Sequence, residues 1–158
     1  MSVDDLINKA LKGGGGMLDT SNMFAIIGEI GTNELFVLNL QDFFAENLIC
    51  FSEGKQTAAI LLGAYVTEDL ARKCIENIRE DQLQGPGLVV APDWHILMAN
   101  PEKNELFSIL LTDYYISCLA FYSYQVKYDI LPIGILENKD AADAAIDIIK
   151  YTIRSRNF

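Results

Sequence analysis

The sequence contains few of the residues from which active sites and metal centres are built. Its 158 residues include one histidine, His95, and three cysteines, Cys50, Cys74 and Cys118. One histidine excludes metal sites that need two imidazole ligands, and no nucleophile accompanies it in a recognisable motif. The cysteines are odd in number and form no Cys-x-x-Cys pair, so neither a disulfide framework nor a zinc site is predicted. We expect reduced, buried thiols, a reducing compartment, and no resident metal or cofactor.

Positive charge is also scarce. Twelve Lys and Arg stand against 22 Asp and Glu, which gives a formal net charge of −10. Nucleic-acid backbones and anionic membranes are bound by clustered Lys and Arg, so we expect neither as a partner. An acidic surface favours solubility, or a basic protein partner attracted by opposite charge.

Long apolar runs and a basic leader are missing as well. No apolar run approaches the roughly 18 residues of a membrane span, and the stretch around Ile109 to Leu111 stops at Thr112 and Asp113. The chain begins with Met1 to Asp5, which is acidic where a signal peptide is basic. We therefore expect a cytoplasmic protein.

What is present is a hydrophobic content of 51% in a length that favours one domain. Helical periodicity and capping residues predict helices over 2–12, 68–81 and 140–154, and the apolar stretch 55–66 is interpreted as a further, buried helix. The run from Gly13 to Gly16 is followed by Met17 and not by the Gly-Lys-Ser/Thr of a phosphate-binding loop. It is interpreted as a flexible joint.

Strand signals occupy much of the rest. A hairpin is predicted over 23–40 around the turn Gly31-Thr32-Asn33, whereas 41–53 fits a helix or a strand. Further strands are predicted at 88–90, 94–98, 106–111, 122–130 and 133–136, and no internal repeat is expected. The prediction is one α+β domain over 1–158, a mostly antiparallel sheet with N-terminal, central and C-terminal helices packed on it.

One pattern has an enzymatic interpretation. Pro92-Asp93 and Glu137-Asn138-Lys139 resemble the PD-(D/E)xK nuclease motif. The resemblance implies that Asp93 and Glu137 hold Mg²⁺, that Lys139 assists the attacking water, and that Glu76 or Glu80 completes the site. A turn carboxylate followed by a helix start accounts for the same residues without any chemistry.

Tyrosines suggest a different function. In the strand predicted at 122–130, strict alternation places Tyr122, Tyr124 and Tyr128 on one face, where they could anchor a protein partner. Stacking of nucleic-acid bases is disfavoured because Lys127 is the one basic residue among them.

These observations favour a non-catalytic cytoplasmic protein-binding module, of the adaptor, secretion-chaperone or inhibitor and immunity type. The order of elements is similar to that of roadblock/longin-type adaptor domains and secretion chaperones, a likeness that no residue motif carries. The partner would be another protein, of basic or mixed charge, and association of two copies through a sheet edge is compatible with this hypothesis. The alternatives are a metal-dependent nuclease using Asp93, Glu137 and Lys139, and a small-molecule-sensing domain.

Overall fold

Two hairpins with similar turns begin the two halves of the fold. The computed structural model describes residues 18–55, 59–79, 88–126 and 130–156. In the first hairpin, Gly31 and Asn33 adopt positive φ values of 103° and 60°, and in the second Asn104 adopts 51°. Glycine and asparagine tolerate this left-handed region, which is why they reverse the chain here. The hairpin predicted over 23–40 is confirmed.

The described residues form two antiparallel three-stranded sheets and four helices, so the predicted α+β class is confirmed. The elements in chain order are β1 (Phe24–Glu29), β2 (Glu34–Asn39), α2 (Leu40–Ser52), β3 (Ala59–Tyr65), α3 (Glu68–Arg79), β4 (His95–Asn100), β5 (Glu105–Leu110), α4 (Leu111–Ser123), β6 (Leu131–Leu136) and α5 (Lys139–Arg156). The sheet orders are β2-β1-β3 and β5-β4-β6. The helix predicted at 2–12 and the glycine joint at 13–16 lie outside the described residues.

The two sheets belong to two copies of one ββαβα unit, so the expectation that the chain has no internal repeat is wrong. The first residues of β1, β2, α2 and α3 are separated by the same intervals as those of β4, β5, α4 and α5, and the starts of β3 and β6 depart from this offset by a single position. Even the irregularity in strand pairing recurs at the same offset, between Ile26 and Ile27 in the first unit and between Leu97 and Met98 in the second. The sequence signal is short: Asn-Glu-Leu-Phe occurs at 33–36 and again at 104–107. Superposing these two segments on the sequence defines the equivalent positions of the two units.

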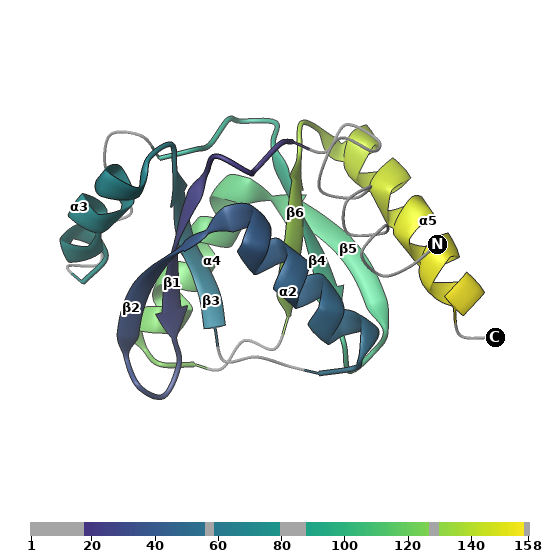
Figure 1. Cartoon of the computed structure of the whole chain (residues 1–158), viewed down its shortest axis with the longest axis horizontal. Helices are drawn as coiled ribbons and strands as arrows, with labels where there is room; N and C mark the ends of the chain where they lie inside the picture. Colours follow the sequence, from purple (N-terminus) through teal and green to yellow (C-terminus); the bar gives the residue numbers. More distant parts are fainter. Residues whose placement is uncertain (1–17, 56–58, 80–87, 127–129, 157–158) are drawn as a thin grey trace.

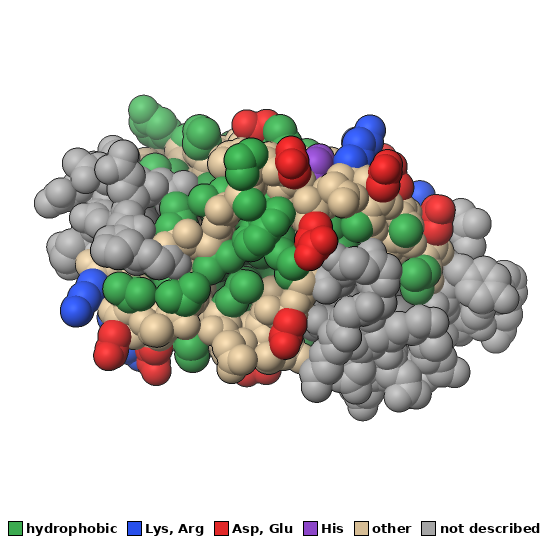
Figure 2. Space-filling model, turned by 90° about the horizontal axis from the view of Figure 1, so that it is seen from above, with side chains coloured by type: hydrophobic (Ala, Val, Ile, Leu, Met, Phe, Trp, Pro, Cys, Tyr) green, Lys and Arg blue, Asp and Glu red, His purple; other side chains and the backbone are tan. Residues whose placement is uncertain are grey.

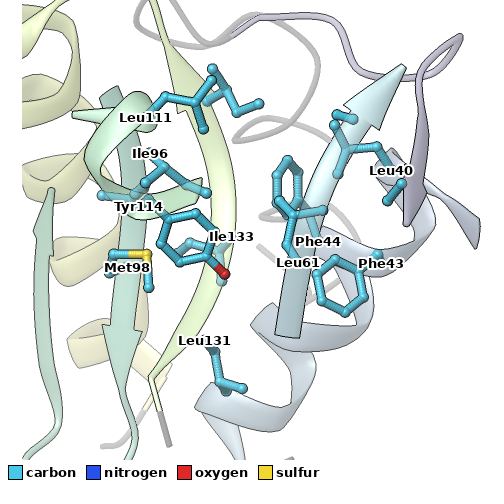
Figure 3. Packing of buried hydrophobic residues seen from close by; sticks show 14 of the residues in the cluster. Leu40, Phe43, Phe44, Leu61, Ile96, Met98, Leu111, Tyr114, Leu131 and Ile133 are labelled. Carbon is cyan, nitrogen blue, oxygen red and sulfur yellow. The ribbon is translucent and has the colours of Figure 1, made fainter. Parts of the chain in front are cut away.

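The helices arrange the two sheets in layers (Figure 1). Helix α3 packs on the first sheet and α5 on the second, at the two ends of the molecule, while α2 and α4 lie between the sheets. Each central helix packs mainly against the last strand of the other unit, α2 on β6 and α4 on β3. Figure 3 shows Phe43 and Phe44 of α2 and Tyr114 of α4 in this shared core. The units therefore share one hydrophobic core.

Backbone hydrogen bonds at the sheet edges also join each unit to the other. The amide of Leu18, ahead of β1, donates to the carbonyl of Ile135 in β6 at 2.9 Å. The amide of Val89, ahead of β4, donates to the carbonyl of Ala64 in β3 at 2.7 Å. The two donors occupy equivalent positions of the two units, and so do the two acceptors. The leading segment of each unit thus extends the sheet of the other.

Two segments differ from their predicted structure. The buried helix predicted over 55–66 is wrong, because Ala59–Tyr65 is the strand β3. Its residues are apolar without alternation because helices cover both of its faces, so period two is lost. The strand predicted over 122–130 is also wrong: α4 continues to Ser123, and residues 127–129 lie outside the described part.

Helix α4 is explained by its buried side chains. Leu111, Tyr114, Tyr115, Cys118 and Tyr122 follow one another at helical spacing and face the core. Tyr122 and Ser123, the first residues of the alternating pattern, therefore belong to a helix and not to a strand. None of the helices that the structure describes is long and apolar enough to cross a membrane.

Candidate functional site

All four described helices begin at one end of the molecule, the upper end in Figure 1. This follows from the topology, because each helix starts directly after a strand that runs toward that end. We call this surface the upper face; it is formed by residues 18–23, 66–69, 88–94 and 137–140 together with the starts of the helices and the ends of the strands that precede them.

Three of the four described helix starts on the upper face carry a side-chain cap, and the start of α4, at Leu110, carries none. The side chain of Asn39 accepts a hydrogen bond from the amide of Asp42 at 3.1 Å, and that of Thr67 accepts one from Leu70 at 3.1 Å. Asn138 caps α5 by accepting from the amide of Ala141 at 2.8 Å. Acidic residues also occupy the first turn of every described helix, where they complement the helix dipole; they are Asp42, Glu68, Asp69, Asp113 and Asp140. The upper face is therefore unsuited to an anionic ligand.

Aliphatic side chains are exposed on the same face. Val66 follows β3 and is 53% exposed, and Val90 in the segment before β4 is 37% exposed. Leu38 and Leu110 lie at the ends of the strands β2 and β5, just before the helices begin, and each is 37% exposed. Figure 2 shows hydrophobic side chains gathered over the middle and left of this face. Exposed apolar side chains that gather on one face mark interaction sites more often than isolated ones do.

Acidic side chains border this apolar surface (Figure 2). Beyond the helix starts, Asp19, Asp93 and Glu137 are exposed on the upper face. In Figure 2 most of the acidic side chains in view lie to the right of the apolar surface, toward the second unit. Among these residues, Glu68 forms an ion pair with Arg72 at 2.7 Å, and Asp19 accepts hydrogen bonds from the amide and the hydroxyl of Ser21 at 3.0 and 2.7 Å. The arrangement places apolar side chains beside acidic ones, with Lys139 at the start of α5 among them.

The residues of the nuclease-like motif also lie on the upper face. Strands β4 and β6 pair with His95 opposite Leu136, so Asp93 and Glu137 lie at the same end of neighbouring strands, and Lys139 begins α5. Among the described residues, however, no group of three or more Asp, Glu, His and Cys side chains could hold a metal ion. Of the two additional carboxylates, Glu76 lies in α3 and Glu80 lies outside the described residues. The nuclease interpretation gains no metal centre from this arrangement and stays a prediction.

The three tyrosines predicted to anchor a partner are not together on a strand. Tyr122 is buried, and its hydroxyl donates to the carbonyl of Asn33 at 2.8 Å. Tyr124 is the residue that ends α4, away from the upper face, and is 81% exposed. Tyr128 lies outside the described residues. The structure therefore leaves Tyr124 accessible and uses Tyr122 to hold α4 against the first hairpin.

The surroundings of Cys50 and Cys118 raise the pKa of both thiols. Burial raises the pKa of the Cys118 thiol from its ordinary value of 9.0 to about 12. Burial, followed by the charges of Glu46 and Glu53, also raises the pKa of Cys50. A nucleophilic cysteine needs the opposite shift, so these two thiols are packing groups. All three cysteines are free of disulfides, as the sequence predicts.

His95 has a structural partner. Its Nδ1 lies 2.9 Å from the backbone carbonyl of Asp93, two residues before it in the turn that leads into β4. This contact holds the imidazole of His95 against the backbone of the turn. The residue lies at the start of β4, at the border of the upper face.

The sequence alone does not reveal the upper face as a site. Glu68, Asp69 and Asp140 stand at the starts of helices that the sequence predicts, but the convergence of the helix starts follows from the repeated order of strand then helix, which places them all at one end. The repeated Asn-Glu-Leu-Phe at 33–36 and 104–107 is the sequence signal that reveals the duplication. No protein-family model matches this chain, and neither do any curated proteins or solved structures in the comparisons made with them.

Proposed function

We propose that this protein is a non-catalytic protein-binding module and that it binds its partner with the upper face. The observation that carries the proposal is the set of exposed aliphatic side chains at Leu38, Val66, Val90 and Leu110, bordered by acidic residues. Burial of such side chains favours association, and the surrounding charge selects the partner.

The partner that fits is a protein segment with aliphatic and basic side chains. The face is acidic, so Lys and Arg on the partner would be attracted and acidic segments repelled. Adaptor, chaperone and inhibitor roles all use such binding. The three cysteines, none of which is in a disulfide, support a reducing compartment, and we propose the cytoplasm.

The test is a binding titration with a fluorescent peptide of mixed leucine and lysine, followed by anisotropy, with the wild-type chain and two matched variants. Val90→Asp adds a charge to the upper face, whereas Ile49→Asp makes the same kind of change on α2; both residues are 37% exposed. Asp is compatible with the backbone at position 90, because the equivalent position of the first unit is Asp19.

Saturable binding to the wild type, weakened about tenfold by Val90→Asp and within twofold of wild type for Ile49→Asp, supports the proposal. Absence of saturable binding up to millimolar peptide, or equal weakening by both variants, contradicts it. Loss of binding on Tyr124→Ala, with Val90→Asp unchanged, would instead assign binding to the exposed tyrosine at the end of α4 and refute the upper face.

A further inference from the structure

The outward side of α4 carries no charge over most of its length. From Tyr114 to Val126 the sequence has no Asp, Glu, Lys or Arg, in a chain whose formal net charge is −10. The charged residue of this helix, Asp113, lies in its first turn. Ile116 is nevertheless 66% exposed, and Val126, just beyond the helix, is 47% exposed. Surface helices usually carry charged residues on the side that faces solvent, so this stretch calls for an explanation.

The duplication provides a matched helix with the same backbone. Helix α2 occupies the equivalent positions of the first unit, and the two helices end alike. The residues that end them, Glu53 and Tyr124, both have a φ of −96°, and the residues that follow, Gly54 and Gln125, both have positive φ. In Figure 1, α2 lies on the near side of the molecule and α4 on the far side. Their outward surfaces can therefore be compared position by position.

Every charged residue that follows the first turn of α2 is replaced by an uncharged one on α4. On α2 these residues are exposed; they are Glu46, Glu53 and Lys55. The equivalent residues of α4 are exposed as well; they are Ser117, Tyr124 and Val126. Exposed positions accept charged and uncharged side chains alike without affecting the core, so folding does not require this difference.

Three residues of α4 give its outward side an approximate symmetry. Ile116, Ala120 and Tyr124 follow one another at intervals of four, which places them on one side of the helix. The amide of Tyr124 donates to the carbonyl of Ala120 at 3.0 Å, so the helical spacing continues to the last of them. Two large side chains thus flank a small one. If α4 lies antiparallel to an identical helix about a two-fold axis at Ala120, each Ile116 meets the other copy's Tyr124, and the small residue lets the backbones approach.

From the missing charge and this symmetry we propose that the outward side of α4 binds the same side of a second copy of the chain. Two copies that each carry a charge of −10 repel one another. A surface without charge is where they can touch without placing acid against acid, whereas a basic partner would favour the acidic residues that this side lacks. The proposal is independent of the function proposed for the upper face, because it uses neither the valines nor the acids of that face.

The size of the surface sets the strength of the contact. Helix α4 has 13 residues and is therefore about 20 Å long. One crossing of two such helices covers less than the roughly 1,200 Å² at which standard interfaces begin. We therefore expect a weak, reversible dimer that is populated at about 100 µM and above.

The experiment is sedimentation equilibrium of the full-length chain from about 10 to about 500 µM, with one charged variant and one matched control. The charged variant, Ser117→Glu with Tyr124→Glu, places on α4 the residues that α2 carries at the equivalent positions, so its backbone accepts them. The control, Ile49→Glu with Ser52→Glu, adds the same two charges at exposed positions of α2. Circular dichroism checks that both variants are folded.

We expect the wild type to dimerise more tightly as salt is raised from about 50 to about 500 mM, because salt screens the repulsion between the copies. The charged variant of α4 should raise the dissociation constant about tenfold or more, and the control should stay within about threefold of wild type. In an Ala120→Cys variant, mild oxidation should join two copies through residue 120, because the two-fold axis brings these positions together.

The contrary outcomes are equally definite. A monomer at every concentration overturns the proposal. A dimer that both double variants weaken equally, or that neither weakens, also overturns it and would place the contact elsewhere, such as at the edge strands β2 and β5. A dimer that loosens as salt rises would depend on ion pairs, which this side of α4 does not offer. Copies joined through Cys50 and not through residue 120 would overturn the arrangement about Ala120.

Discussion

The packing of Tyr122 against Gly28 provides a quantitative test of how the two units are held together. A Cβ atom added at Gly28 would lie 2.6 Å from Cδ1 and 2.9 Å from Cε1 of Tyr122, and 2.8 Å from Cδ1 of Leu62. Contacts this short cannot persist, so Gly28→Ala forces the tyrosine ring away from β1. The ring belongs to α4 of the second unit, and its hydroxyl donates to Asn33 of the first.

The cost follows from two contributions. Overpacking a well-filled core costs about 1–3 kcal/mol. Displacement of the ring also breaks the 2.8 Å hydrogen bond to Asn33, and such a bond contributes about 0.5–1.5 kcal/mol. We therefore expect Gly28→Ala to lower the free energy of unfolding by about 2–4 kcal/mol. The backbone itself accepts alanine, because the equivalent position in the second unit is the buried Ala99.

The assay is urea unfolding followed by circular dichroism, applied to Gly28→Ala, Tyr122→Ala and the double variant. Tyr122→Ala alone removes a buried ring and should cost about 3–5 kcal/mol. In its background the two ring contacts are gone, and the end of the Leu62 side chain, which would lie 2.8 Å from the added methyl group, can turn into the vacated volume. The double variant should therefore be no less stable than Tyr122→Ala within about 0.5 kcal/mol. Additive costs of the two substitutions would refute this account of the interface.

Three further predictions concern stability. Asn47→Leu should cost about 1–3 kcal/mol in urea unfolding, because it leaves the carbonyl of Pro132 without the 2.8 Å hydrogen bond from the buried amide; a neutral effect would contradict a structural role for this bond. Ile149→Ala should cost about 2–5 kcal/mol, since this residue of α5 is buried, whereas an effect near zero would mean that α5 does not pack as described. Because burial raises the pKa of Cys118 from 9.0 to about 12, its contribution to stability is complete below pH 9 and is lost as the pH rises toward 12; Cys118→Ala should flatten this decline relative to wild type, and an unchanged slope would argue against it.

The elements with clear periodicity were predictable from the sequence. The hairpin at 23–40 is encoded by its turn residues, and the final helix by its alternating polar and apolar ridges. The strand β3 was not predictable in this way, because burial on both faces removes the alternation that identifies a strand. The end of helix α4 was predicted wrongly because Tyr122 and the residues after it alternate with a period of two, as in a strand.

The candidate site depends more on tertiary arrangement than the individual helices and strands do. Asp140 and Glu68 are recognisable as first-turn acids, but nothing local indicates that their helices begin on one face. Val66 and Val90 likewise come together because the amide of Val89 donates to the carbonyl of Ala64 in β3, a contact between residues far apart in the sequence. The duplication was obscured because side chains at equivalent positions have been substituted widely outside the Asn-Glu-Leu-Phe segments.

The exchange of leading segments between the units bears on how this chain folds. Val89 completes β3, and Leu18 completes β6, so a single unit produced alone would expose an unpaired strand edge and an uncovered apolar helix. We expect such a half to pair with an identical half, because each would cover the strand edge and the apolar helix of the other. In the tandem chain, the same contacts join residues far apart in sequence, which slows folding and couples the halves in one cooperative transition.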